Sequence, residues 1–419
     1  MLEFSGIMSG VELLFNWQIL LMIIIGLIFG IFTGAIPGFS TPLAISIMLP
    51  ITFTMEPLNS IVFLTGIYAG GNFGSSISSI LLNIPGSPQA IVTGLDGHPM
   101  AKQGKANEAL GVALFSSATG NLIGSIFLIL LMPIIVTFAL KFGPPEMFLI
   151  GVIGLTIIAS LHESFLKGMI AGTFGVLIGT IGMTPTGTIR GTFGFFELMD
   201  GIPLIPALIG IIGFSELFYL LQEKSIVSKK ENSKNESESS GNLKKVLIGY
   251  KLAIKYKLTL IRSSIIGVLV GVLPGAGATI ASIVSYNEGR KYSKNSGNFG
   301  KGEPEGIVTA ETANNASEGG ALATVLALGI PGGLATAVLI GALMLQGLTP
   351  GPRLFADNPD LVYGIMLAQI ITSILLFVVG LLMSVHAAKV IHVPTSILIP
   401  IIAILSIIGT YAVNKSLFD

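Results

Sequence analysis

The chain has no cysteine, one tryptophan and four histidines among its 419 residues. Without cysteine it cannot form a disulfide, use a thiol nucleophile or hold a metal by thiolates. His162, His386 and His392 are scattered, and only Glu163 lies at ligand spacing from any of them. We also find no Ser/His/Asp arrangement, phosphate-binding loop or paired-carboxylate motif. We therefore predict a protein that is not an enzyme and that has no cofactor or structural metal.

Charge is scarce as well. Charged residues make up 11% of the chain, and 22 basic residues balance 22 acidic ones, so the net charge is zero. This balance argues against nucleic-acid binding and against a polybasic membrane-surface role. Hydrophobic residues make up 52%, which is too apolar for a soluble surface. The composition indicates an integral membrane protein.

Long apolar runs divide the sequence into membrane segments. A helix needs about 20 apolar residues to cross a bilayer, and on this basis we expect about nine to eleven segments. The N-terminus lacks the basic region and cleavage site of a removable signal peptide, so the first run is expected to be retained. The clearest runs are 17–36, 120–140, 147–161, 203–221 and 370–385.

Glycine and proline are abundant, with 53 and 21 copies. Glycines spaced by four, as at Gly26, Gly30 and Gly34, indicate close helix packing, and the pairs Gly267/Gly271 and Gly168/Gly172 have the same spacing. The pattern G-x-x-x-G-x-x-P-G at 30–38 recurs at 267–275, and a second break, Asn83-Ile-Pro-Gly86, recurs as Gly329-Ile-Pro-Gly332. The sequence thus predicts an all-α polytopic membrane protein with two repeats, each containing Pro-Gly-broken helices or re-entrant hairpins.

A polar segment separates the two repeats. Residues 1–221 form repeat one, 222–258 a basic polar linker and 259–419 repeat two, and the stretch 228–241 is too polar to bury a core. Nine lysines between Lys224 and Lys257 place the linker in the cytoplasm, whereas the first 16 residues contain Glu3 and Glu12 and no basic residue. Repeat one would then start outside and repeat two inside, so the repeats are expected to be inverted.

Two features complicate this topology. The loop after 279–286 is also basic, with Arg290, Lys291, Lys294 and Lys301. Either the segment before this loop is a hairpin that returns to the cytoplasm, or the bias of basic residues toward the cytoplasm fails here. We favour the hairpin. Repeat one also has more apolar stretches after residue 140 than repeat two has after its equivalent. We expect that repeat two lacks its last helices, through truncation or genuine loss.

The breaks are the first candidate site. Pro-Gly followed by small and hydroxyl residues, as at 38–42 and 275–279, starts a new helix at membrane depth. A helix N-terminus has unpaired N–H groups and a partial positive charge, so it can hold a carboxylate without a buried lysine or arginine. The alternative is a purely structural kink.

Polar patches precede the second breaks, at 72–79 and 311–318. Their hydroxyls and amides could bind substrate or a cation, or could simply form inter-helix hydrogen bonds. Glu311 and Glu318 are candidate proton or sodium carriers if they lie at membrane depth, and ordinary surface groups if they lie at the water interface. In contrast, Asp96, His98, Lys102 and Lys105 are typical of a solvated loop, and the segment 184–190, with Arg190, is also expected to be a loop.

The candidate residues fall into two groups. The predicted substrate-binding residues are Gly38, Ser40, Thr41, Asn83, Pro85, Gly86, Gly275, Ala276, Gly277, Thr279, Asn314, Asn315, Pro331 and Gly332. The predicted coupling-ion residues are Glu311, Asn314, Ser75 and Ser76.

Several motifs in order carry a resemblance from about Trp17 to the end. They are the segments 30–38 with Leu49-Pro50, 68–71 (Tyr-Ala-Gly-Gly), 79–86, 95–104 (Leu-Asp-Gly-His-Pro-Met-Ala-Lys-Gln-Gly), 273–280, 313–316 (Ala-Asn-Asn-Ala) and 348–352 (Leu-Thr-Pro-Gly-Pro). The chain resembles the large membrane subunit of the tripartite tricarboxylate transporters. Two departures stand out: Ala310 replaces the proline usual before Glu311, and family members commonly continue past a segment like 414–419.

The resemblance implies the permease of a secondary transporter in a bacterial or archaeal plasma membrane. Its partners would be a small membrane subunit of four helices and an extracytoplasmic solute-binding protein that delivers a carboxylate. A sodium or proton gradient would drive uptake by alternating access. An anion channel and a non-transporting assembly subunit remain alternatives, and the sequence names neither the carboxylate nor the coupling ion.

Overall fold

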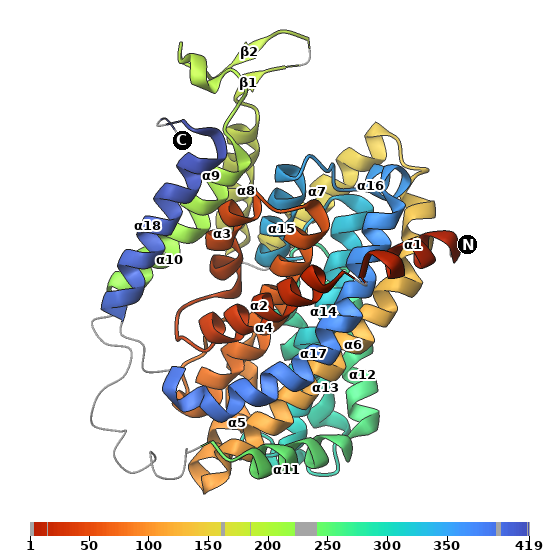
Figure 1. Ribbon diagram of the computed structural model, residues 1–419, viewed down its shortest axis with the longest axis vertical. Coiled ribbons are helices and arrows are strands. Elements are labelled where there is room, and N and C mark those ends of the chain that lie inside the picture. The colour runs from red at the N-terminus through yellow and green to blue at the C-terminus, as the bar shows by residue number, and fades with distance from the viewer. Residues whose placement is uncertain are drawn as a thin grey trace.

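The computed structural model describes residues 4–14, 16–160, 164–184, 186–222, 241–390, 395–416 and 418, and these form a helical bundle with one small hairpin (Figure 1). The first part contains α1 (Phe4–Leu14), α2 (Trp17–Gly34), α3 (Thr41–Thr52), α4 (Pro57–Leu82), α5 (Ala90–Met100), η1 (Ala101–Lys105), α6 (Ala106–Ala139), α7 (Pro144–Ser160), α8 (Phe165–Gly179), β1 (Gly182–Met183), β2 (Ile189–Arg190), η2 (Phe196–Leu198), α9 (Leu204–Leu208), η3 (Ile209–Phe214) and α10 (Ser215–Gln222). The second contains α11 (Leu243–Ile254), α12 (Lys257–Gly271), α13 (Gly277–Tyr292), η4 (Ser296–Asn298), α14 (Pro304–Leu328), α15 (Leu334–Leu345), α16 (Pro352–Asp357), α17 (Pro359–Val390) and α18 (Thr395–Asn414). Glu3, His162, Glu163, His392 and most of the predicted polar stretch 228–241 lie outside the described residues.

The predicted breaks interrupt the helices at corresponding points of the two halves. Helices α2 and α12 end before Pro-Gly, and Gly38 and Gly275 adopt positive φ angles of 75° and 74°. Helices α4 and α14 end in the left-handed conformation, at Asn83 (φ 59°) and Gly329 (φ 71°). Asparagine and glycine are the residues that tolerate this conformation best, which explains why Asn and Gly come directly before the two Ile-Pro-Gly motifs.

Glycine spacing brings pairs of helices into backbone contact. A Cβ atom on Gly30 of α2 would collide with the Ile67 carbonyl of α4, and one on Gly271 of α12 would collide with the Ser317 carbonyl of α14. The small-residue spacing therefore packs α2 on α4 and α12 on α14, as predicted. Each of the long central helices α4 and α14 consequently has a close partner in its own half.

Helices α12 and α13 form a hairpin. The Tyr256 hydroxyl, next to the start of α12, donates to Glu303 Oε1 (2.9 Å), and Thr259 Oγ1 donates to Glu305 Oε1 (2.7 Å). These bonds place the basic loop after α13 beside the start of α12, because the chain turns back at the Pro274-Gly275 break. The two helices thus lie side by side, and the return of the chain to the cytoplasm stays a prediction.

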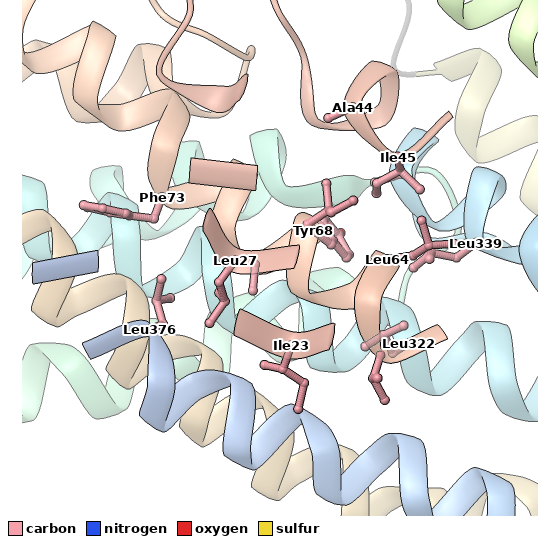
Figure 2. Packing of buried hydrophobic residues seen from close by; sticks show 14 of the residues in the cluster. Ile23, Leu27, Ala44, Ile45, Leu64, Tyr68, Phe73, Leu322, Leu339 and Leu376 are labelled. Carbon is pink, nitrogen blue, oxygen red and sulfur yellow. The ribbon is translucent and has the colours of Figure 1, made fainter. Parts of the chain in front are cut away.

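The apolar core lies between the central helices. Figure 2 shows Ile23 and Leu27 of α2, Phe73 of α4, Leu322 of α14 and Leu376 of α17 within one cluster of buried side chains. The outer helices instead expose apolar side chains, as with Phe148 on α7 and Phe174 on α8. An apolar exterior around a packed interior is what a bilayer environment requires.

Three helical stretches of the described residues are long and apolar enough to cross a membrane, namely 17–34, 90–139 and 359–386. Shorter apolar helices include α3, α8, α15 and the continuous stretch 204–214. The described residues thus contain fewer uninterrupted apolar spans than the nine to eleven segments expected. The short helices α3 and α15 start at interruptions in apolar sequence, whereas α4 and α14 are long enough but contain the polar stretches 72–79 and 311–318.

Two segments expected to be irregular have regular structure. Within the predicted linker, residues 243–254 form α11, which buries Val246, Gly249 and Ala253 and packs on α6. These three positions lie on one helical face, so this part of the linker is amphipathic rather than uniformly polar. The segment 184–190, expected as a loop, ends in β2, which pairs antiparallel with β1 just before the segment, and the pair projects from the bundle in Figure 1.

Candidate functional site

A cavity of about 410 Å³ lies where the breaks of the two halves meet. It is lined by Ser40, Thr41, Pro42, Tyr68, Asn72, Ser87, Pro88, Gln89, Gly275, Ala276, Gly277, Ala278, Thr279, Ile280, Gly333, Leu334 and Ala335. All these lining residues are uncharged, so the polar groups that face the cavity are hydroxyls, amides and backbone N–H groups. Its volume falls within the usual range for small-molecule sites.

Four helices begin at the wall of this cavity. Their N-cap residues are Ser40 for α3, Gln89 for α5, Ala276 for α13 and Gly333 for α15, and each of the four caps lines the cavity. The first N–H groups of a helix have no partner within the helix, and its N-terminus has a partial positive charge. The helix starts therefore give the cavity a positive potential, which suits an anion. In α5 the first N–H groups, those of Ala90 and Ile91, already donate to the carbonyls of Ser87 (3.0 Å) and Pro88 (3.2 Å).

The cavity includes some of the predicted substrate-binding residues and leaves others out. Ser40, Thr41, Gly275, Ala276, Gly277 and Thr279 line it. Gly38, Asn83, Pro85, Gly86, Asn314, Asn315, Pro331 and Gly332 are not among its lining residues. The lining residues that the prediction missed include Tyr68, Asn72 and Gln89. Asn72 lies in the polar patch 72–79 and Tyr68 in the Tyr-Ala-Gly-Gly motif, so both had a signal in the sequence.

The second-break glycines make close backbone contacts. A Cβ atom on Gly86 would collide with the Gly34 carbonyl at the end of α2, and one on Gly332 would lie 2.9 Å from the Gly271 carbonyl at the end of α12. Only glycine permits this close approach. Each second break therefore rests on the end of the helix that precedes the first break, which brings the next helix N-terminus to the cavity.

Glu311 lies in a buried cluster of hydroxyl groups. Its carboxylate accepts hydrogen bonds from Ser76 Oγ of α4 (2.5 Å), Ser117 Oγ of α6 (2.6 Å) and the hydroxyl of Thr93 on α5. Glu311 is fully buried. A buried carboxylate without a cation is costly even when it is hydrogen-bonded, and this cluster supplies oxygen atoms for a proton or a small cation.

The predicted coupling-ion residues lie at different distances from this cluster. Ser76 bonds Glu311 directly, whereas Ser75 donates to the Asn72 carbonyl of its own helix (2.8 Å). Asn314 is fully buried, and neither its amide nitrogen nor its amide oxygen has a hydrogen-bond partner among the described residues. A buried amide without hydrogen-bond partners destabilises the folded protein, and a ligand that bonds to this amide would remove that cost. Asn315 donates to the Glu311 carbonyl (3.0 Å).

Glu318, two helical turns along α14, has a separate amide cluster. Asn72 Nδ2 donates to Glu318 Oε1 (2.5 Å) and Asn121 Nδ2 to Oε2 (2.8 Å). Asn72 also lines the cavity, and its Oδ1 accepts from Gln89 Nε2 (2.9 Å). A continuous path of hydrogen bonds thus joins the cavity to Glu318.

Helices α4 and α5 connect the cavity with both carboxylates. On α4, Asn72 faces the cavity and Glu318, and Ser76, one turn later, bonds Glu311. On α5, Gln89 faces the cavity and Thr93 bonds Glu311. A displacement of either helix would change the cavity and the carboxylate clusters together.

Asp96 is not in a solvated loop, as the sequence suggested, but fully buried in α5. Its Oδ1 accepts the backbone N–H groups of Gly300 (2.8 Å), Gly302 (3.0 Å) and Glu303 (2.9 Å), and its Oδ2 accepts the Tyr286 hydroxyl (2.7 Å). The charged residues next to Asp96 in the sequence suggested a position at the protein surface. In the structure, hydrogen-bond donors from distant parts of the sequence take the place of water around its carboxylate. Asp96 thereby ties α5 to the turn between α13 and α14.

We expect Asp96→Ala to lower the free energy of unfolding by about 3–5 kcal/mol, because it leaves three backbone N–H groups and one hydroxyl without their acceptor. Thermal unfolding of the protein in detergent measures this loss. Tyr286→Phe removes only the hydroxyl bond to the same carboxylate, and it should cost about 1 kcal/mol. Equal stabilities of the two variants would contradict this role of Asp96.

Comparison with known proteins identifies the family of this chain. The sequence profile described as the tripartite tricarboxylate transporter TctA family matches residues 20–419. An uncharacterized 52.8 kDa protein in the TAR-I ttuC' 3' region of Agrobacterium vitis is 36% identical over 400 residues, which cover 94% of this chain and 77% of that protein. An uncharacterized protein in the TAR-II ttuC' 3' region of the same organism is 39% identical over 153 residues, or 36% of this chain and 63% of that protein. No solved structure matches the chain.

Proposed function

Because the chain belongs to the TctA family, the membrane component of tripartite tricarboxylate transporters, we propose that it is a permease subunit that imports a tricarboxylate or related carboxylate anion. The observation that carries this proposal is the convergence of four helix N-termini on one uncharged cavity. The substrate carboxylates would bind there to backbone N–H groups, with Ser40, Thr41 and Thr279 as hydroxyl ligands.

Import would be coupled to a sodium or proton gradient at Glu311. The hydroxyls of Ser76, Thr93 and Ser117 surround its carboxylate, and the unpartnered amide of Asn314 lies on the same helix less than one turn away. A cation or proton bound there would remove the cost of the buried negative charge. Because α4 and α5 also reach the cavity, substrate and ion would bind to one connected unit.

Transport would proceed by alternating access between two inverted repeats. The recurring Pro-Gly breaks support this proposal, as does the matching contact of Gly86 with the end of α2 and Gly332 with the end of α12. Discontinuous helices at the interface of two repeats are a recurring design of secondary transporters. One bundle that carries both hairpins would move against a scaffold, as in an elevator.

The partners proposed for the chain are a small membrane subunit of four helices and a solute-binding protein that delivers the carboxylate from outside. The location proposed is the bacterial or archaeal plasma membrane. The match to the TctA family and the exposed apolar side chains on helices such as α7 and α8 support both.

Uptake of radiolabelled citrate, malate, tartrate and succinate into proteoliposomes tests the proposal. The vesicles would contain this chain and its small membrane subunit, with the binding protein added outside. We expect accumulation of at least one carboxylate that requires the binding protein and stops when the sodium or proton gradient is collapsed. Flux that continues without a gradient and without the binding protein would indicate an anion channel. No flux of any of the four would contradict the proposed substrate class.

A further inference from the structure

Glu318 differs from Glu311 in how it is bonded. Its two carboxylate oxygens accept N–H groups from side-chain amides, and one of these amides, Asn72, is itself part of the cavity wall. An ionised Glu318 thus uses the Asn72 NH₂ group and turns the Asn72 oxygen toward Gln89. The cavity side then presents an acceptor where an anion needs donors.

The two amides are not equally free to reorient. Asn121 Oδ1 accepts a hydrogen bond from the Ser373 hydroxyl of α17 (2.6 Å). This bond holds the Asn121 amide in the orientation in which its NH₂ group donates to Glu318. Asn72 Oδ1 accepts from Gln89 Nε2 at 2.9 Å and from Thr41 Oγ1 at 3.5 Å, and both donors belong to residues that line the cavity. A ligand in the cavity could replace these two partners.

We propose that Glu318 is a second coupling site, which takes up one proton and thereby switches the Asn72 amide into a substrate-binding orientation. A proton from water adds to Oε1, so the carboxylate becomes a neutral carboxyl with an O–H group. That O–H needs an acceptor, which the Asn72 NH₂ group is not. A half-turn of the amide places Oδ1 against the O–H and directs Nδ2 to the cavity.

The switch changes the cavity in two ways that favour an anion. Asn72 Nδ2 becomes a donor to the ligand, and Gln89 Nε2, having lost its acceptor, becomes a second one. The negative charge of Glu318, one side chain away from the cavity, also disappears, which removes a repulsion that is strong in a weakly polar interior. Substrate and proton therefore bind cooperatively, and each raises the affinity for the other.

The groups around Glu318 support a single-proton switch. Tyr68 of α4 is a buried titratable group that lines the cavity one turn before Asn72, and Glu311 lies two turns away from Glu318 on α14. From α6 and α17 the facing groups are the uncharged Asn121 and Ser373. From α12 the facing surface is backbone, since Gly271 packs directly on Ser317 and Gly320.

This inference rests on the proposed function, and its test compares wild type with Glu318→Gln, a permanently neutral carboxyl analogue. Counterflow of the radiolabelled carboxylate that the wild type transports would be measured between about pH 5.5 and 8.5, with the apparent KM as the readout. We expect the wild-type KM to rise about tenfold more than the variant's as pH increases, since only the wild type can lose the Glu318 proton in this range. Glu318→Gln should also carry one proton fewer per substrate, measured with a pH-sensitive dye inside the vesicles.

Glu305→Gln is the matched control, because Glu305 lies on the same helix and accepts hydrogen bonds from Thr259 and Ser293. Glu305→Gln should keep the wild-type dependence of KM on pH. Because titration of the substrate affects all variants equally, this control also separates that effect from the titration of Glu318. A wild-type pH profile and proton stoichiometry in Glu318→Gln would overturn the inference and leave the permease function standing.

A second measurement does not depend on transport. Infrared difference spectra of the wild type between high and low pH should contain the C=O band of a protonated carboxyl that Glu318→Gln lacks. Absence of a band assignable to Glu318 would overturn the inference. Failure of the wild type to transport any of the tested carboxylates would instead count against the proposed function.

Discussion

Glu311→Gln is expected to reduce gradient-driven uptake about 100-fold, which corresponds to about 3 kcal/mol of lost coupling. The amide has nearly the same shape as the carboxyl, and its oxygen still accepts from the hydroxyls of Ser76 and Thr93. Its NH₂ group takes the place of Oε2 and donates to the Ser117 oxygen, which reverses that hydrogen bond. The amide can neither bind a proton nor neutralise a cation. Initial uptake rates in proteoliposomes with an imposed sodium or proton gradient measure the effect.

Thermal stability separates this loss from misfolding. Replacing a fully buried carboxylate by a neutral isostere removes a desolvation cost, so Glu311→Gln should be at least as stable as the wild type. Glu305→Gln, the same chemical change two turns earlier on α14, should transport at close to the wild-type rate. Wild-type accumulation by Glu311→Gln would show that the coupling ion binds elsewhere.

The second large effect is expected for Gly275→Val, which should reduce uptake more than tenfold while leaving membrane insertion intact. Gly275 lines the cavity with a φ of 74°, a conformation that costs a β-branched residue about 1–3 kcal/mol. A shift of the break to relieve this strain would displace the N-terminus of α13 from the cavity. The readouts are uptake of the transported carboxylate and the amount of protein in the membrane.

Gly347→Val is the matched control, since Gly347 has a φ of 73° and is solvent-exposed, with open space around its missing side chain. It imposes a similar backbone strain after α15, away from the cavity. Uptake should therefore remain within about twofold of wild type, because exposed substitutions have small effects. Similar losses in the two variants would attribute the Gly275→Val defect to general strain.

Local sequence signals predicted the parts of the site that lie close together in the chain. Pro-Gly and Ile-Pro-Gly predicted the breaks, because proline and left-handed glycine end helices wherever they occur. Glu311 and Ser76 stood out as polar residues in apolar sequence, and the structure brings them into contact. The resemblance to the transporter family was also confirmed, over residues 20–419.

The partners from other helices could not be predicted in this way. Ser117 and Asn121 lie within the long apolar helix α6, and their spacing of four places them on one face, but only packing on α14 pairs them with Glu311 and Glu318. Asp96 was misjudged for the same reason, since its four donors come from α13 and the turn before α14. Local sequence shows which polar side chains lie on the face of a helix, whereas the packing of the helices determines which of these side chains form hydrogen bonds with one another.

The four helix starts at the cavity also set a charge capacity. Each helix N-terminus is equivalent to about half a positive charge, so the four together amount to about two. A dianion would be neutralised without any lysine or arginine, and because peptide groups do not titrate, this capacity is the same at every physiological pH. A trianion would exceed it by one negative charge, so its binding in the cavity would require one additional proton or cation.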